Sequence, residues 1–503
     1  MPLMTGKTAA LALAIAATAS VLATVSSADA SEGKAVTPSL AWGTCDGEDH
    51  DARQECATLS VPLDYRDPDG KRITLAVSHI RSERPGARRG TLLLIPGGPG
   101  GSGLNRPTTY GKRLPQSVRD AYDLVGFDPR GLGGSTHADC GLADEDLSLA
   151  TSRPWPAADG GITGNVTTAR RIADACARNG GDLVRSLSTV NEARDIDRIR
   201  QALGERKLSA WNTSYGTYVG SVYAQLYPER TDRWVLDSND DPDPTRVERG
   251  WLANLAVGVE DSFPAFAEFA SSLPEAERLA DTPAGVRRVV LDLAARLDAE
   301  PLPRDGAAQP VLDGNMFRQS VLTALYSQKN FKDLAPFIKG VRDGHAPAET
   351  PGRMTQDAAA VSYATLCNDV EWPRSVSAYA RDVAAGRASH PLTAGMPGNI
   401  TPCAFWPDKP QDKPVRVTDR GPSNVLLVQN RHDVATPYSG ALNLRRAFGD
   451  RARMVSVDST GHGAAYVPAP YTSSCADRAV TDYLVRGERP AGDVSCPAPE
   501  EAP

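Results

Sequence analysis

The sequence lacks the residue patterns of most metal-binding and nucleic-acid-binding proteins. It has no C-x-x-C pair and no H-E-x-x-H motif, so we expect neither a metal ion nor another cofactor. Lysine and arginine number 55 against 62 aspartates and glutamates, a formal net charge of -7, and the basic residues form no stripe. This balance argues against a nucleic-acid partner. After residue 30, no apolar run approaches the length that spans a membrane.

The first thirty residues have the pattern of a secretory signal peptide. Lys7 precedes an alanine- and leucine-rich stretch at 9–25, and Ala28-Asp-Ala30 supplies a small-x-small cleavage site. We therefore expect cleavage before Ser31 and a secreted protein with no stable membrane association. An uncleaved anchor is the alternative, but threonine and serine residues dilute this short stretch.

Eight cysteines, all after residue 30, fit an oxidising compartment. Eight cysteines allow on the order of a hundred connectivities, so the sequence alone does not determine the pairing. Neighbouring positions suggest these pairs: Cys45 with Cys56, Cys140 with Cys176, Cys367 with Cys403, and Cys475 with Cys496.

Alternating apolar and polar stretches predict an α/β fold. Between Leu59 and Leu236, short apolar runs alternate with helix-like stretches, which indicates a mostly parallel sheet covered on both faces. Helical spacing then replaces the strand-like runs, as in Phe317, Val321 and Leu325. We predict core segments at 31–239 and 415–503, the second with a disulfide-bearing C-terminal segment, and an inserted helical cap at 240–414. An independent helical domain is the alternative.

The segment 208–220 has the layout of a nucleophile elbow, in which a sharp strand-to-helix turn exposes a serine. Ser214 stands between small residues, after an apolar run and before a plausible helix start. Asn212 occupies the position that is glycine in the usual G-x-S-x-G motif. Alone, this pattern is also compatible with an ordinary strand-helix junction.

An acid and a histidine follow in the order that such hydrolases require. Asp433 comes after the strand-like run 424–429, and His462 stands between two glycines after the strand-like run 453–457. Imidazole titrates near neutral pH and can take the serine proton, while a carboxylate orients the imidazole. His432 is a poorer candidate for the base, because it is the chain neighbour of Asp433.

A glycine-rich loop at 96–103 follows the apolar run 91–95 and is a candidate oxyanion hole. Gly98 and Tyr215 are the expected backbone N–H donors to the developing alkoxide. The loop also matches the dinucleotide-binding pattern G-x-G-x-x-G, with Asp123 and Asp128 as possible ribose ligands. Pro99 argues against that interpretation, because proline removes an N–H from the phosphate cradle.

Taken together, the motifs resemble those of secreted tripeptidyl aminopeptidases, α/β-hydrolase exopeptidases related to prolyl aminopeptidases. The resemblance implies that Ser214 is the nucleophile, Asp433 the triad acid and His462 the base, and Asn212 departs from the family glycine. It rests on these segments: Trp42-Gly-Thr-Cys45, Val61-Pro-Leu-Asp-Tyr65, Pro96-Gly-Gly-Pro-Gly-Gly-Ser102, Phe127-Asp-Pro-Arg-Gly131 with Ser135, Thr213-Ser-Tyr-Gly-Thr217, Val235-Leu-Asp237, Asp433-Val-Ala-Thr-Pro437 and Gly461-His-Gly463.

We therefore expect a secreted serine exopeptidase that removes tripeptides, other short peptides or single residues from free N-termini. Its partners would be peptides with a free N-terminus, and the oligomeric state is left open. Asp369 and Glu371, beside Cys367, are candidates for binding the substrate ammonium, although solvated surface acids would look the same. An esterase or lipase with the same triad is one alternative. A non-catalytic binding protein is another, for which Asn212 is the one hint.

Overall fold

The structure is a computed structural model that describes residues 40–47, 49–245, 247–304, 311–346 and 352–499. The signal peptide predicted for residues 1–30 lies outside these ranges. All the described residues belong to one compact unit, 38–503.

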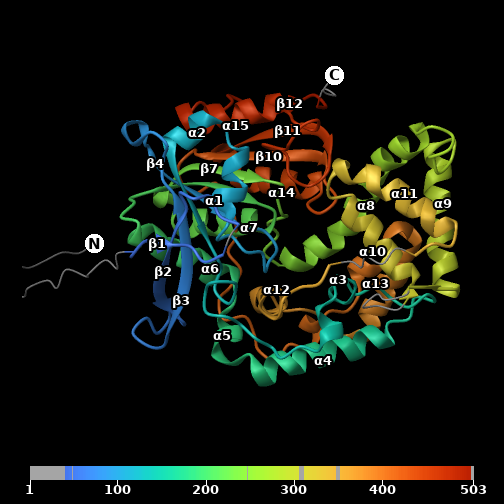
Figure 1. The fold of residues 1–503 in the computed structure, drawn as a ribbon. Helices are drawn as coiled ribbons and strands as arrows, with labels where there is room; N and C mark the ends of the chain where they lie inside the picture. The colour runs from blue at the N-terminus through green and yellow to red at the C-terminus, as the bar shows by residue number, and fades with distance from the viewer. Residues whose placement is uncertain (1–39, 48, 246, 305–310, 347–351, 500–503) are drawn as a thin grey trace, which may run out of the picture. The chain divides into compact units, whose positions relative to one another are not determined.

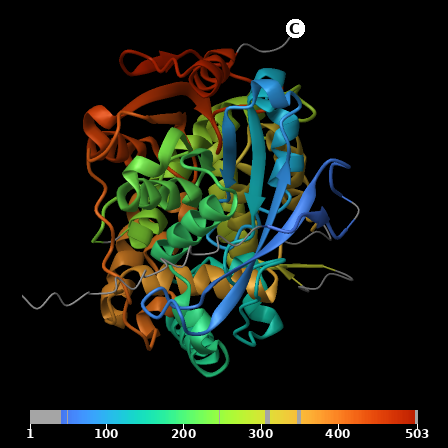
Figure 2. The ribbon, with the colours of Figure 1, turned by 90° about the vertical axis from the view of Figure 1, so that its left-hand side faces the viewer.

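A single ten-stranded sheet forms the centre of this unit, in the order β1-β2-β3-β5-β4-β6-β7-β10-β11-β12 (Figure 1). The strands from β5 to β12 run parallel, whereas β1, β2 and β3 pair antiparallel at one edge (blue in Figure 1 and Figure 2). This confirms the predicted α/β fold. The strands are β1 Gly43–Thr44, β2 Glu55–Pro62, β3 Arg72–Ile80, β4 Gly90–Ile95, β5 Tyr122–Phe127, β6 Leu208–Thr213, β7 Thr231–Asp237, β10 Val425–His432, β11 Ala452–Thr460 and β12 Val494–Cys496.

Both faces of the sheet are buried, because successive side chains of a strand point to opposite sides. In β4, Leu93 and Ile95 join one core cluster with helices α6, α7 and α14, while Leu92 and Leu94 join another with α2 and α15. Figure 1 shows α2 and α15 together on one side of the sheet. The helices of the core are α1 Arg106–Thr109, α2 Gln116–Ala121, α3 Leu149–Ser152, α4 Thr163–Asn179, α5 Gly181–Ser186, α6 Thr189–Ala202, α7 Tyr215–Leu226, α14 Tyr438–Phe448 and α15 Ser474–Arg486.

Between β7 and β10 the chain is mainly helical. Phe317, Val321 and Leu325 are buried in a separate apolar cluster, which Trp155 also joins from the long connection between β5 and β6. A two-stranded sheet, β8 Leu302–Pro303 with β9 Val311–Leu312, interrupts the helices; the spacing of apolar residues did not predict it. The helices are α8 Val247–Ser272, α9 Pro283–Ala299, α10 Gly314–Ala324, α11 Phe331–Arg342, α12 Gln356–Asp369 and α13 Val376–Ser389.

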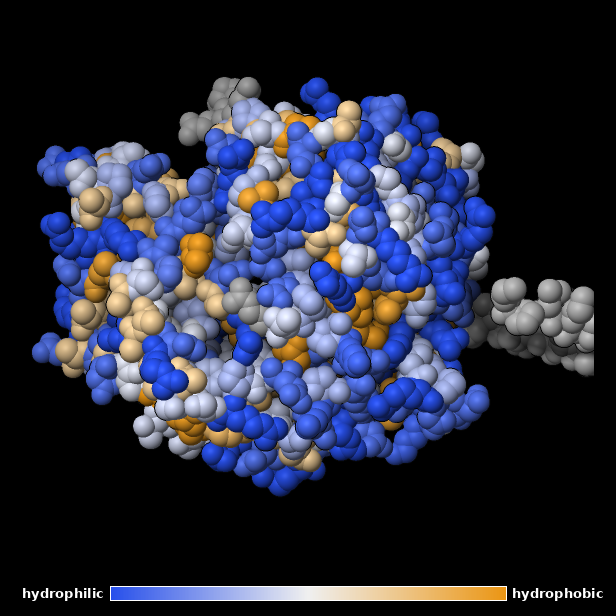
Figure 3. Space-filling view, turned by 180° about the vertical axis from the view of Figure 1, so that it is seen from behind, coloured by the Kyte–Doolittle hydropathy of each residue, from blue (hydrophilic) through white to orange (hydrophobic). Residues whose placement is uncertain are grey.

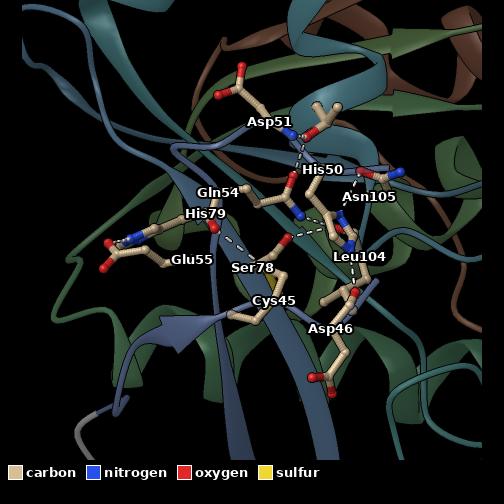
Figure 4. Close-up of a disulfide and its surroundings, with 12 residues drawn as sticks. Cys45, Asp46, His50, Asp51, Gln54, Glu55, Ser78, His79, Leu104 and Asn105 are labelled. Carbon is tan, nitrogen blue, oxygen red and sulfur yellow. Dashed lines mark hydrogen bonds and ion pairs between the residues drawn. A yellow bond between two sulfur atoms is a disulfide. The ribbon is translucent and has the colours of Figure 1, made fainter. Parts of the chain in front are cut away.

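The four disulfides pair as predicted, and the first is close to the glycine-rich loop. Cys45 bonds Cys56 at the start of β2 (Figure 4). Beside this disulfide, the side chains of Gln54 and Ser78 both donate a hydrogen bond to the carbonyl of Leu104, just after that loop. The disulfide-linked edge of the sheet therefore holds the end of the loop.

On the face shown in Figure 3, hydrophobic residues form small patches separated by hydrophilic ones. The large hydrophobic side chains that count as exposed in the described ranges lie on five different elements: Leu226, Val257, Val311, Val376 and Val494. None of the helices in these ranges is long and apolar enough to cross a membrane.

Candidate active site

Ser214 occupies a sharp turn between β6 and α7. Its backbone angles, φ 58° and ψ -133°, lie in a region that residues other than glycine rarely adopt. Neighbouring groups hold the turn: the Ser214 N–H donates to the Asp237 carbonyl at 3.1 Å, and the Ser214 carbonyl accepts from the Thr217 N–H at 2.7 Å. The local geometry is that of a nucleophile elbow.

Two glycines allow the loop after β4 to approach this turn. A Cβ atom on Gly97 would lie 2.8 Å from the Ser214 Cβ, and one on Gly216 would lie 2.6 Å from the Pro96 carbonyl oxygen. Both distances are too short for a side chain. Gly216, the second residue after the serine, is therefore needed for the close approach of α7 to the loop.

Asn212, which departs from the family motif, fits because of a third glycine. Its side chain is fully buried (0% exposed) and donates a hydrogen bond to the Val235 carbonyl at 2.7 Å. A Cβ atom on Gly220 of α7 would lie 2.4 Å from the Asn212 Oδ1. The space that the asparagine needs is thus provided by the facing helix, and its amide joins β6 to β7.

Asp433 and His462 form a hydrogen-bonded pair at the ends of β10 and β11. The His462 Nδ1 lies 3.0 Å from each carboxylate oxygen of Asp433, which is fully buried (0% exposed). The carboxylate also accepts from the backbone N–H groups of Ala435 and Thr436, at 2.9 and 3.0 Å. These bonds assign the proton to Nδ1 and leave Nε2 as the basic nitrogen.

Burial opposes the charged form of His462, but the nearby carboxylates of Asp433, Asp240 and Asp237 favour it. The net effect raises the pKa of His462 above its ordinary value of 6.5.

Asp237, the last residue of β7, holds the loop that carries His462. Its carboxylate accepts from the N–H groups of Ala464 and Ala465 at 2.8 and 3.0 Å, and the adjacent Ser238 hydroxyl accepts from the Gly463 N–H at 2.8 Å. The sequence motif at Val235-Leu-Asp237 contained this positioning residue, but the motif alone did not reveal its role.

The carboxylate of Asp128 holds the end of the glycine-rich loop. The Asp128 Oδ1 accepts from the N–H groups of Gly103 and Leu104, both at 3.0 Å, and from the Ser102 hydroxyl at 2.5 Å. The other candidate ribose ligand, Asp123, pairs with Arg88 at 2.6 Å. Both carboxylates therefore have structural partners, which removes the basis of the dinucleotide interpretation.

Ser214 lies where two cavities meet. The larger, of about 910 Å³, is also lined by Gly98 and His462. The smaller, of about 250 Å³, is lined by Ser214, Gly98, Tyr215 and Asp240 together with residues of the inserted helices. Ser214 and Gly98 thus line both cavities, His462 lines the larger and Tyr215 the smaller, and Asp433 is hydrogen-bonded to His462. Tyr215 is the first residue of α7, where the helix dipole favours negative charge.

The two predicted ammonium ligands lie elsewhere. Asp369 ends α12, and its carboxylate accepts from the backbone N–H of Thr189 at 2.9 Å and from the Thr189 hydroxyl. Glu371 is 69% exposed and lies 3.9 Å from Lys409. Neither lines the two cavities, although Leu366 and Cys403, near them in the fold, line the smaller one.

Sequence reasoning missed a buried acid beside Ser214. Asp240 is 6% exposed and lines the smaller cavity, and its Oδ2 has no hydrogen-bond partner within the described part of the chain. The signal was present, since Asp240 comes just after β7 at the carboxyl edge of the sheet, as Asp433 does after β10. His432, the rejected base, is 42% exposed and pairs with Asp261 at 3.1 Å.

Comparison with known proteins shows the family of the chain. Residues 391–496 match the family described as TAP-like protein. Over 89% of its length, the chain is 34% identical to the tripeptidyl aminopeptidase of Streptomyces lividans, of which it covers 84%. The chain belongs to the tripeptidyl aminopeptidase family. It is accordingly an enzyme, a serine hydrolase of the aminopeptidase type with an α/β-hydrolase fold.

The chain is also similar to two proteins that are not named as tripeptidyl aminopeptidases. The chain is 29% identical to serine protease Hip1 of Mycobacterium tuberculosis, over 88% of the chain and 87% of that protein. It is 28% identical to carboxylesterase B of the same organism, over 92% of the chain and 90% of that protein.

Proposed function

We propose that this enzyme removes short peptides, tripeptides among them, from free N-termini through a triad of Ser214, His462 and Asp433. The observation that supports this most directly is the Asp433–His462 pair at the cavity into which the elbow places Ser214. The 34% identity to a tripeptidyl aminopeptidase supports the peptide substrate and the size of the product.

The proposed reaction proceeds through an acyl-enzyme. The Ser214 Oγ attacks the scissile carbonyl carbon while the His462 Nε2 takes its proton, and the carbonyl oxygen becomes an oxyanion. The N–H groups of Gly98 and Tyr215 stabilise that oxyanion. His462 then gives its proton to the leaving amine, and water, activated by the same imidazole, releases the acyl group from Ser214.

We also propose secretion and a cap. Four disulfides support an oxidising destination, reached after removal of residues 1–30. For residues 240–414, the role of a cap is supported by Tyr326, whose ring contacts His462 edge-on at 5.4 Å between centroids and which lines both cavities.

Fluorophosphonate labelling followed by peptide mapping tests this proposal. We expect one labelled residue, Ser214, and no labelling of Ser214→Ala. The label on Ser214 should also be lost or greatly slowed in His462→Ala. Labelling at another serine, or none in the wild-type enzyme, would contradict the proposed nucleophile. The name carboxylesterase B makes an ester hydrolase the second candidate; equal hydrolysis of N-blocked esters and free peptides would favour it.

A further inference from the structure

The two cavities that meet at Ser214 differ in their charged residues, apart from Arg153, which lines both. Asp237 lines the larger one, but its carboxylate is already bonded to the loop of His462. Among the described residues, none of the arginine and lysine side chains that line this cavity forms an ion pair with a carboxylate. They are Arg106, Arg113, Arg153, Lys329 and Lys332.

The smaller cavity contains an acid in apolar surroundings. Asp240 shares its lining with Trp251, Leu252 and Leu255 of α8. A buried carboxylate without a hydrogen-bonded partner is unfavourable, and a bound cation would remove that penalty. The cavity is therefore suited to a ligand that is positively charged at one end and otherwise apolar.

The backbone of Asp240 is tied to the elbow. Its N–H donates to the Thr217 hydroxyl at 3.1 Å, and that hydroxyl donates to the Ser214 carbonyl at 2.7 Å. The backbone of Asp240 is thus fixed relative to that of Ser214. A residue that determines substrate specificity needs such a fixed position.

We propose that Asp240 binds the N-terminal ammonium of the substrate in the smaller cavity, and that the basic residues of the larger cavity hold the leaving peptide through its carboxylates. This inference rests on the proposed exopeptidase function. A peptide with free ends is positive at its N-terminus and negative at its C-terminus, so the two cavities complement its polarity about the scissile bond.

The titration of Asp240 fits a site that accepts a cation. Burial raises the pKa of Asp240 to about 8; Asp433 and Asp241 add to the rise and His462 opposes it. The other charged or titratable groups that line this cavity are Arg153, Tyr215, Tyr326 and Tyr363. Burial therefore favours the protonated carboxyl in the free enzyme, and a bound ammonium favours the ionised form.

The first test compares substrates with and without the amine. We would measure kcat/KM for a tripeptide p-nitroanilide and for its analogue lacking the α-amine, in the wild type and in Asp240→Asn. The variant should lose at least about 30-fold on the amine substrate, the factor typical of truncating a buried charge pair, and less than threefold on the analogue. An equal loss on both substrates, or no loss on either, would overturn the proposal.

Asp241→Asn is the matched control, because Asp241 is the adjacent buried acid but lines neither cavity. Its Oδ2 accepts from the Asn443 side chain at 2.8 Å. This variant should keep the wild-type ratio between the two substrates. Fluorophosphonate labelling of Ser214 in all three proteins distinguishes failure of this proposal from failure of the proposed function. If Ser214 is labelled and Asp240→Asn keeps the wild-type ratio between the two substrates, the role of Asp240 is refuted. If Ser214 of the wild type is not labelled, the proposed function is refuted.

The second test concerns the leaving peptide. Two substrates that differ only in a C-terminal carboxylate or carboxamide should differ about three- to tenfold in kcat/KM, and salt should reduce the difference. The double variant Lys329→Ala and Lys332→Ala should remove most of the preference, while Lys409→Ala, at an exposed lysine outside both cavities, should keep it. A wild type without preference would contradict this half of the proposal.

Discussion

At the scale of single residues, we expect opposite effects on kcat from replacing the two histidines near Asp433. His462→Ala removes the proposed base, and loss of such a triad member typically lowers kcat by about 10⁶-fold. His432→Ala should be mild, because its half-exposed ring pairs with Asp261 and lines neither cavity. Steady-state hydrolysis of a tripeptide p-nitroanilide measures both. A severe effect of His432→Ala with a mild effect of His462→Ala would identify His432, and not His462, as the base.

The close approach of Asn212 to Gly220 indicates that Asn212 contributes to the packing of β6 against α7. Asn212→Gly breaks the hydrogen bond to the Val235 carbonyl and empties a buried space, so we expect a lower melting temperature and a lower kcat. The hydrogen bond alone corresponds to about 0.5 to 1.5 kcal/mol of unfolding free energy.

A double-mutant cycle tests whether that effect comes from the contact itself. Gly220→Ala should destabilise the wild type, since the new methyl would lie 2.4 Å from Asn212 Oδ1. It should cost less in the Asn212→Gly background, where the close neighbour that remains is Trp234 Nε1 at 3.1 Å. Thermal unfolding of the four proteins gives the coupling. Additive effects, or a large rise in kcat for Asn212→Gly at unchanged melting temperature, would mean that the asparagine only crowds the elbow.

At the scale of elements, Glu192 of α6 links pH to stability. Burial, aided by Asp195 and Asp369, raises the pKa of Glu192 from 4.5 to about 8, although Tyr215 donates to it at 3.3 Å. The unfolded carboxyl ionises near pH 4.5 while the folded one keeps its proton, so this group lowers stability progressively as the pH rises from 4.5 to 8.

The Glu192→Gln variant should therefore be more stable relative to wild type at pH 8 than at pH 5. The measurement is the difference in melting temperature between variant and wild type, determined at each of the two pH values. Asp240 has the same sign and remains in both proteins, so it cancels in the comparison. An equal shift of the variant at both pH values would show that the Glu192 carboxyl ionises normally in the folded protein.

The elements show what the sequence could and could not predict. Apolar runs located the core strands, such as β10 after Asn424, because a strand buried on both faces is apolar throughout. Chain order predicted Ser214, Asp433 and His462 as a triad, and the structure places His462 against Asp433. Adjacency to a disulfide did not place Asp369 in the cavity, because the direction of a side chain depends on its partner in the fold, here Thr189. Asp128 was likewise assigned a role only by its contacts with the loop.

At the scale of the whole molecule, four disulfides each join residues that are 11 to 36 positions apart in the sequence. Removing one native disulfide typically lowers the free energy of unfolding by about 2 to 5 kcal/mol, so reducing agent should markedly lower the melting temperature. Intact mass under denaturing conditions should rise by eight hydrogens on reduction, two for each of the four bridges. Thiols that react with an alkylating reagent before reduction would contradict the pairing.

The most direct test of the central claim is mass spectrometry of the products from one peptide, offered with a free and with an acetylated N-terminus. The account predicts stepwise release of short N-terminal fragments, tripeptides foremost, from the free peptide. It also predicts very little cleavage of the acetylated one, and no release from either peptide by Ser214→Ala. Internal cleavage, equal processing of both peptides, or full activity of Ser214→Ala would contradict an exopeptidase that uses this serine.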